Sequence, residues 1–110
     1  MTSEATEFSV VDVPERRRFE LREGDRVAAF AQYSRSAGEI ALVHTETAPE
    51  YEGKGVGSRL VAGALDAARS EGLAVLPFCP FVRRYIAEHA DIYLDLVPAA
   101  RRDEFGLPVT

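Results

Sequence analysis

The chain has 110 residues, of which 46% are hydrophobic and 28% are charged, and this predicts one globular domain rather than two domains or a disordered chain. The 13 lysine and arginine residues are outnumbered by 18 aspartate and glutamate residues, so the formal net charge is -5. This acidic balance argues against a protein that holds duplex nucleic acid through its phosphates.

The first predicted elements are four short extended segments. They lie at residues 8–13, 18–22, 27–33 and 39–45. The connections between them have hairpin length and contain turn-forming residues such as Pro14, Gly24 and Gly38. Parallel crossovers need about a dozen residues or more, so the four segments are expected to form an antiparallel meander.

The hydrophobic periodicity changes after this meander. Apolar residues recur at steps of three and four, which predicts an amphipathic helix over residues 56–70 that ends before Gly72. The apolar run at 73–78 predicts a buried strand. Because a helix leads into it, this strand is expected to lie beside the fourth strand and parallel to it.

A second helix is predicted to begin at Pro80, whose missing N–H group is tolerated in a first turn, with Cys79 as the N-cap. A short last strand is predicted at residues 92–94. The element order describes an α+β fold with a mixed sheet. Residues 7–97 are expected to form the domain, residues 1–6 a flexible N-terminus and residues 98–110 a C-terminal tail.

Cys79 is the one cysteine in the sequence. It excludes an internal disulfide and a cysteine–histidine metal cluster, so no metal is expected and a reducing compartment is favoured. No window approaches the ~18 apolar residues that a membrane span requires. The protein is therefore expected to be soluble and cytoplasmic, without a membrane or nucleic-acid partner.

A loop with glycines at 53, 55 and 57 lies between the fourth strand and the first helix. Glycines let a backbone approach a ligand closely, and the free N–H groups of a helix's first turn attract anions, so a pyrophosphate site is predicted. The other interpretation is a glycine-rich turn that only connects two elements. The loop matches neither the ATP-binding motif, because Lys54 precedes Gly55, nor the dinucleotide fingerprint.

Three motifs occur in order: His44-Thr45-Glu46, the loop Glu52-Gly53-Lys54-Gly55-Val56-Gly57, and Cys79-Pro80-Phe81-Val82. Together they resemble the GCN5-related N-acetyltransferase (GNAT) superfamily, and more narrowly its small single-domain branch, over roughly residues 19–96. The resemblance implies a GNAT-like sheet with four antiparallel strands and a parallel fifth. It also implies an N-acetyltransferase that moves an acetyl group from acetyl-coenzyme A to an amine.

Two features depart from the superfamily pattern. The loop begins with Glu52 where an arginine or glutamine is usual, which leaves backbone donors and Lys54 to hold the phosphates. The two helices that usually separate the first two strands, and often shape the acceptor site, are missing because Val13 and Arg18 are almost adjacent. The acceptor amine therefore stays unknown.

The resemblance also implies site residues, because acetyl-coenzyme A binds in this superfamily where the fourth and fifth strands diverge. The implied cofactor-binding residues are Val43, Thr45, Gly53, Lys54, Gly55, Val56, Gly57 and Ser58. The thioester would then lie near the candidate catalytic residues His44, Glu46, Cys79 and Tyr85.

Each candidate catalytic residue has two interpretations. His44 could take a proton from the amine, or it is a half-buried histidine bonded to a hydroxyl. Glu46 could do the same through a water molecule, or it is a solvated acid. Cys79 could form an acetyl-cysteine or protonate the leaving thiolate, or it is an inert buried thiol. Tyr85 could protonate that thiolate, or it belongs to the core with its hydroxyl satisfied.

The main hypothesis is direct attack of the amine on the thioester, with strand amides holding the carbonyl oxygen. The alternative is a non-catalytic acyl-CoA-binding or interaction module with the same fold. The net charge of -5 weakly favours a cationic acceptor, such as a polyamine. Open sheet edges allow either a monomer or a homodimer.

Overall fold

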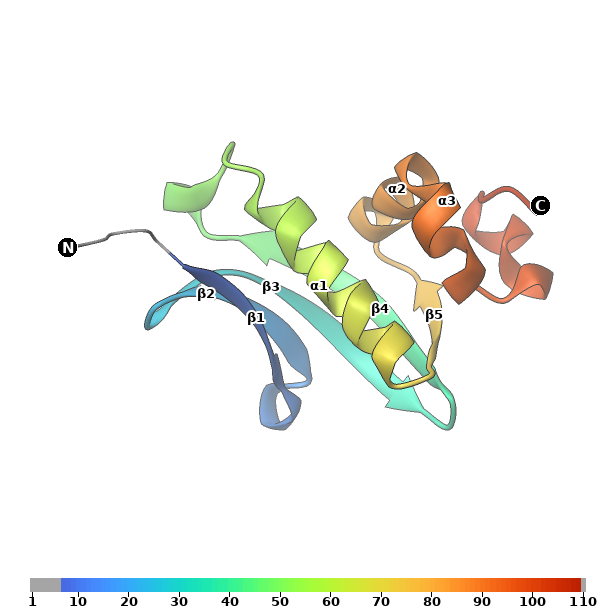
Figure 1. The fold of residues 1–110 in the computed structure, drawn as a ribbon, viewed down its shortest axis with the longest axis horizontal. Coiled ribbons are helices and arrows are strands. Elements are labelled where there is room, and N and C mark those ends of the chain that lie inside the picture. Colours follow the sequence, from blue (N-terminus) through green and yellow to red (C-terminus); the bar gives the residue numbers. More distant parts are fainter. Residues whose placement is uncertain (1–6, 110) are drawn as a thin grey trace.

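One mixed sheet forms the body of the computed structural model, which describes residues 7–109 (Figure 1). Its strands are β1 (Phe8–Val13), β2 (Arg18–Glu23), β3 (Arg26–Ser36), β4 (Glu39–Thr47) and β5 (Ala74–Pro77), in that spatial order. The pairs from β1 to β4 are antiparallel, and β5 lies parallel to β4. The predicted α+β class and strand arrangement are confirmed.

The connection between β1 and β2 is a single 3-10 turn, η1 (Pro14–Arg16). Val13 is the register partner of Arg18, so the two strands pair right up to this turn. The structure thus confirms that no helices separate the first two strands. Arg17 closes the turn in the left-handed conformation, with φ 53° and ψ 49°.

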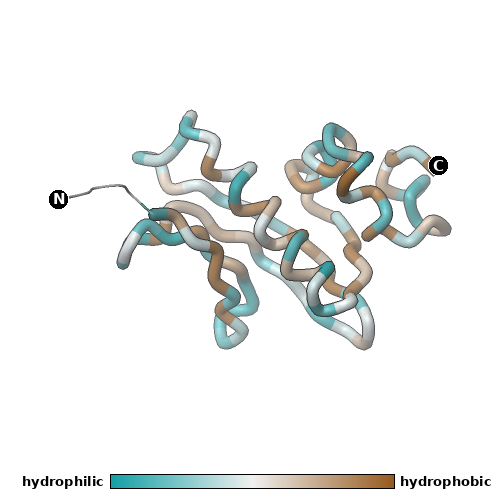
Figure 2. Tube along the Cα trace, in the orientation of Figure 1, coloured by the Kyte–Doolittle hydropathy of each residue, from teal (hydrophilic) through white to brown (hydrophobic). Residues whose placement is uncertain are grey.

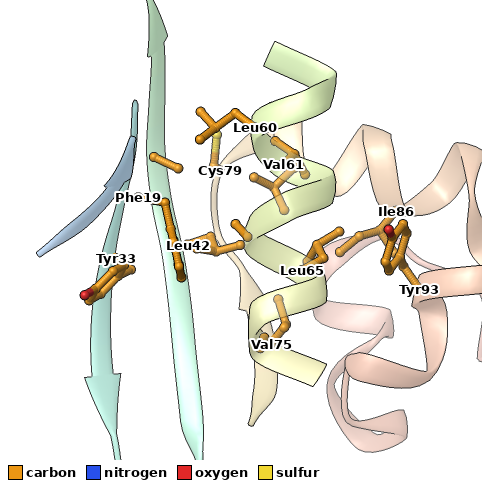
Figure 3. Packing of buried hydrophobic residues seen from close by; sticks show 14 of the residues in the cluster. Phe19, Tyr33, Leu42, Leu60, Val61, Leu65, Val75, Cys79, Ile86 and Tyr93 are labelled. Atoms are coloured by element: carbon orange, nitrogen blue, oxygen red, sulfur yellow. The ribbon is translucent and has the colours of Figure 1, made fainter. Parts of the chain in front are cut away.

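Helix α1 (Val56–Ser70) covers one face of the sheet (Figure 1). Its hydrophobic and hydrophilic residues alternate along its length (Figure 2), and most of the apolar ones are buried. The buried residues are Val56, Leu60, Val61, Ala64, Leu65 and Ala68. Figure 3 shows Leu60 and Val61 directed toward Phe19 and Leu42 of the sheet. This interface forms the core, and the predicted helix bounds are confirmed.

The chain from Pro80 to Leu96 is mostly helical. It forms α2 (Pro80–Glu88), α3 (Ala90–Tyr93) and the 3-10 turn η3 (Leu94–Leu96). The prediction of a strand at residues 92–94 is therefore wrong. A run of three apolar residues does not distinguish strand from helix, and here the Tyr93 hydroxyl donates a 2.9 Å hydrogen bond to Asp66 of α1. None of the helices between residues 7 and 109 is long and apolar enough to cross a membrane.

The segment that was expected to be a tail is folded onto the domain as far as residue 109. It contains two 3-10 turns, η4 (Ala99–Arg101) and η5 (Asp103–Phe105). Phe105 and Leu107 are buried, and the Phe105 ring meets Phe78 edge to face with 5.1 Å between centroids. The flexible N-terminus expected at residues 1–6 lies outside the described residues, as does Thr110.

Candidate functional site

Strands β4 and β5 diverge halfway along β4. Their parallel register runs from Glu39 opposite Ala74 to Leu42 opposite Pro77. Beyond it, the Cys79 backbone N–H donates a 2.9 Å hydrogen bond to the Leu42 carbonyl. In the described register, no β5 residue pairs with residues 43–47 of β4. This half of β4 therefore presents backbone groups on that side that can pair with a ligand.

A β-bulge lies where this divergence begins. The register pairs Gln32 with His44 and Tyr33 with Leu42, so Val43 is an extra residue without a partner in β3. Val43 is 44% exposed. Bulges redirect the side chains that follow them and are common beside active sites.

The glycine loop adopts a conformation that glycine favours. Gly53 and Gly55 have φ values of +80° and +74°, and a Cβ atom on either would meet no atom within 4 Å. These glycines are thus required by the backbone conformation, and the space above them is open. The loop is fixed at its base by Tyr51, a buried residue whose hydroxyl donates a hydrogen bond to Glu23 of β2.

The first turn of α1 follows this loop directly. Gly55 is the N-cap and supplies no side-chain hydrogen bond. The first hydrogen bond of the helix is the one that the Arg59 N–H donates to the Gly55 carbonyl at 3.3 Å. The N–H groups of Val56, Gly57 and Ser58 precede it and have no acceptor within the helix. These donors and the helix dipole give the loop a positive electrostatic character toward an anion.

A cavity of about 390 Å³ lies between this loop, the end of β4 and α2. Its lining residues are Thr47, Tyr51, Glu52, Gly53, Gly55, Val56, Gly57, Ser58 and Phe81. Five of the residues predicted to bind the cofactor, Gly53, Gly55, Val56, Gly57 and Ser58, are among them. Lys54 is exposed on the same loop. Val43 and Thr45 precede Thr47 in β4 and do not line the cavity.

Sequence reasoning missed Tyr51 and Phe81 as lining residues. Tyr51 and Phe81 stand inside or beside the motifs, but nothing in the sequence shows that α2 returns to the first turn of α1. A Cβ atom on Gly57 would lie 3.0 Å from the Phe81 ring and 3.7 Å from the Thr47 hydroxyl. Gly57 thus permits the close approach that closes one end of the cavity.

Cys79 lies on the α1 side of the sheet, at the N-cap of α2. It is 4% exposed, and its Sγ atom is 3.7 Å from the Thr45 hydroxyl. Figure 3 places its side chain beside Leu60 of α1. The thiol therefore belongs to the boundary between the core and the diverging strands.

His44 and Glu46 lie on the opposite face of the sheet. Their side chains are 50% and 60% exposed, and His44 Nε2 is 2.9 Å from Glu46 Oε2. The His44 ring also meets Phe30 of β3 at a centroid distance of 6.4 Å. The structure brings these two candidates together but leaves Cys79 on the other side of β4.

Tyr85 occupies a third place, on α2. Its ring stacks on His89 with 4.2 Å between centroids and lies 5.9 Å from the Tyr93 ring. Burial, followed by the negative charge of Asp66, raises the pKa of the Tyr85 hydroxyl. Tyr85 is not among the residues that line the cavity of the glycine loop. Within residues 7–109, no three His, Cys, Asp or Glu side chains gather in a metal-binding group.

Comparison with known proteins identifies the family. A profile of the family described as GCN5-related N-acetyl-transferase matches residues 18–96. The chain belongs to this family. The GNAT match begins with β2 and extends to η3, so it includes the diverging strands, the glycine loop and the first turn of α2.

A solved GNAT structure has the same fold. It is the solution NMR structure of a GCN5-like protein from Staphylococcus aureus that is assigned as an N-acetyltransferase. The match has a TM-score of 0.59 and 24% identity, and it covers 82% of this chain and 87% of that chain. A search of the curated proteins finds no match. GNAT membership supports an acyltransferase, and acetyltransferase activity in general.

Proposed function

We propose that the protein transfers an acetyl group from acetyl-coenzyme A to a primary amine. The observation that carries this proposal is the position of the glycine-loop cavity at the free end of β4. Thr47 belongs to β4 and also lines the cavity, so one ligand can contact the loop and the unpaired half of the strand.

The residues of the cavity fit a coenzyme A diphosphate. The N–H groups of Val56, Gly57 and Ser58 would donate to phosphate oxygens. The open space above Gly53 and Gly55 lets phosphates approach the backbone, since a Cβ atom there would meet nothing within 4 Å. The amide groups of the pantetheine arm would pair with the free edge of β4, and this directs the thioester toward Val43.

Acetyl-coenzyme A supplies a thioester whose acyl carbon accepts the amine lone pair; a C–N bond forms, the C–S bond breaks, and the thiolate takes a proton. The residues of this chain would orient the thioester and the amine and would accept the proton of the amine. Backbone N–H groups of β4 near the bulge would stabilise charge on the carbonyl oxygen. His44 and Glu46 form a hydrogen-bonded pair that can accept the proton released by the amine.

Calorimetric titration of coenzyme A and acetyl-coenzyme A tests the binding half of the proposal. The decisive variant is Gly55→Val, because a valine is strained at φ +74° and fills the mouth of the loop. Gly38→Val is the matched control. Gly38 has φ +76° and equally open space, but it lies in the turn between β3 and β4.

Loss of binding in Gly55→Val with binding retained in Gly38→Val supports the loop assignment. Thiol release on adding amines to the acetyl-coenzyme A complex supports transfer. Binding without thiol release from any amine would instead favour a non-catalytic acyl-CoA-binding module. Absence of binding at millimolar coenzyme A would contradict the proposal.

A further inference from the structure

A second hollow lies beside the β4 bulge. It has a volume of about 450 Å³ and is lined by Glu15, Arg16, Arg17, Gln32, Tyr33 and Val43. The first three residues come from the turn between β1 and β2, and the others from β3 and β4. We name it the arginine groove. Gln32 is exposed between the buried residues Ala31 and Tyr33, so its side chain lies on the sheet face opposite α1.

The arginine groove adjoins the place proposed for acyl transfer. Val43 is the bulge residue and the first residue of β4 beyond the last β5 pair. Gln32 is the register partner of His44, and such partners have Cβ atoms about 4.5–5.5 Å apart. A small molecule in the groove therefore lies beside His44 and the free half of β4.

The charges that line the groove are mostly positive. Arg16 and Arg17 are exposed, and within the described part of the chain neither forms an ion pair. Glu15 is the one acid in the lining, so its net charge is positive. By contrast, Arg18 and Arg22 of β2 both bind Glu20. The groove thus keeps two guanidinium groups available for a ligand.

Arg17 is held in place by its backbone. It has φ 53°, and it is the one residue other than glycine with a positive φ among residues 7–109. A left-handed conformation is strained for such a residue, and a glycine would avoid this strain. The Arg17 N–H donates to the Pro14 carbonyl at 3.0 Å, and its carbonyl accepts from the Tyr33 N–H at 2.9 Å. Strain that persists in this way is typical of functional sites.

We infer that the arginine groove binds an anionic group of the acceptor, which is a small primary amine that also carries a carboxylate or a phosphate. This inference rests on the proposed function, because it places the acetylated amine next to Val43. Guanidinium groups bind both anions through paired hydrogen bonds, so the experiment has to distinguish the two. The positive charge of the arginine groove disfavours the cationic acceptor that the net charge of -5 weakly favours.

A set of matched linear amines tests the inference on the full chain with acetyl-coenzyme A. The acceptors are aminopropyl phosphate and γ-aminobutyrate, aminopropanol with a neutral hydroxyl in place of the anionic group, and diaminopropane with a second ammonium group in that place. Release of coenzyme A thiol gives kcat/KM for each acceptor. We expect at least one anionic amine to exceed both aminopropanol and diaminopropane by about tenfold, and the better anion identifies the group.

The double variant Arg16→Gln/Arg17→Asn removes both charges, and asparagine tolerates the left-handed backbone at position 17. The ratio of kcat/KM for the better anionic acceptor to kcat/KM for aminopropanol should fall to about one in this variant. Arg84→Ala is the control, because it removes an exposed arginine of α2 outside the groove and should keep the ratio. A wild-type protein without preference, or a preference that survives the double variant, overturns the inference.

Direct binding separates this inference from the proposed function. Amide NMR signals are followed while aminopropyl phosphate or γ-aminobutyrate is added without acetyl-coenzyme A. Shifts at Arg17, Gln32 and Val43 that vanish in the double variant support the groove even when no amine releases thiol. If no amine releases thiol and these signals do not move, the inference is wrong. If the wild-type protein does not bind coenzyme A but the amine still shifts these NMR signals, only the proposed function is contradicted.

Discussion

The ring of Phe81 lies so close to the first turn of α1 that a Cβ atom on Gly57 would be 3.0 Å from its Cζ atom and 3.3 Å from Cε2. Both residues line the cavity of the glycine loop. The two helices beside the cavity therefore meet at one glycine and one aromatic ring, and the position of the ring sets the width of the cavity at this end.

The contact predicts the effect of Gly57→Ala. The new methyl group forces the Phe81 ring to move, and both residues line the cavity. We therefore expect coenzyme A binding to weaken about tenfold, or about 1.4 kcal/mol. The free energy of unfolding should change by less than about 1 kcal/mol, because alanine also favours the helix over glycine. Calorimetric titration and urea denaturation measure the two quantities.

Gly63→Ala is the matched control for this prediction. A Cβ atom on Gly63 would lie 2.5 Å from Val10 of β1, so this variant should lose stability through crowding in the core. It should keep the coenzyme A affinity, since Gly63 is outside the cavity lining. Unchanged affinity in Gly57→Ala would show that the ring does not shape the binding site.

The position of Cys79 predicts direct transfer to the amine. Cys79 is 4% exposed and its thiol contacts the Thr45 hydroxyl, while the base candidates His44 and Glu46 lie on the other face of the sheet. A covalent acyl-cysteine needs a base that activates the thiol. We expect Cys79→Ala to retain kcat within about tenfold of the wild type. Two results would establish the covalent route instead: acetylation of Cys79 detected by mass spectrometry of the intact protein, and loss of turnover in Cys79→Ala.

Local patterns were sufficient for most of the fold. The apolar period defines α1, and its predicted bounds at residues 56–70 are those of the structure. Strand β1 likewise matches its prediction at residues 8–13. The cavity at the glycine loop also follows from local chemistry, because glycines at a strand-to-helix junction leave both room and free donors.

The faces of the site could not be predicted, because they depend on the β4 bulge. Regular alternation would place His44 on the same face as the buried residues Ile40 and Leu42. The extra residue Val43 reverses this order, so Thr45 turns toward the core and His44 toward the open face. Nothing in the local sequence indicates the bulge, because the bulge is defined by the pairing of β4 with β3.

The folded C-terminal segment was also hidden from local patterns. Residues 98–110 lack a regular hydrophobic period. The order of residues 98–109 comes from tertiary contacts, such as that of Phe105 with Phe78, and from the hydrogen bond of 2.9 Å that the Arg102 side chain donates to the Val97 carbonyl. Contacts of this kind depend on the position of α2. That position depends on the tertiary structure of the whole domain, so a local pattern does not predict it.

Glu20 predicts a pH dependence of stability. It is 2% exposed on β2, and its carboxylate oxygens lie 2.7 Å from Arg22 and 2.8 Å from Arg18. Burial alone raises the pKa of Glu20, but hydrogen bonds from Arg22 and Arg18 outweigh it and hold the pKa below its ordinary value of 4.5. A lowered pKa in the folded state stabilises the protein above pH 4.5, and this contribution is lost as the pH falls through the folded value.

Glu20→Gln should therefore lower the free energy of unfolding by about 2 kcal/mol at neutral pH. The difference from the wild type should narrow as the pH falls below 4.5, because the wild-type carboxylate then becomes protonated. Urea denaturation at several pH values measures it. Glu88→Gln, an exposed position on α2, should show little difference at any pH. A difference for Glu20→Gln that stays constant in acid would contradict the assignment.

Phe105 predicts that the C-terminal segment contributes to stability. Its ring is 5% exposed, meets Phe78 at 5.1 Å and lies under the Arg101 guanidinium at 5.6 Å. Phe105→Ala should lower the free energy of unfolding by about 3 kcal/mol, since it removes a buried aromatic side chain and leaves a cavity. Val109→Ala is the control in the same segment, because Val109 is 55% exposed and should cost less than about 0.5 kcal/mol. Denaturation of both variants measures the difference, and equal small losses would mean that the segment adds nothing to the folded domain.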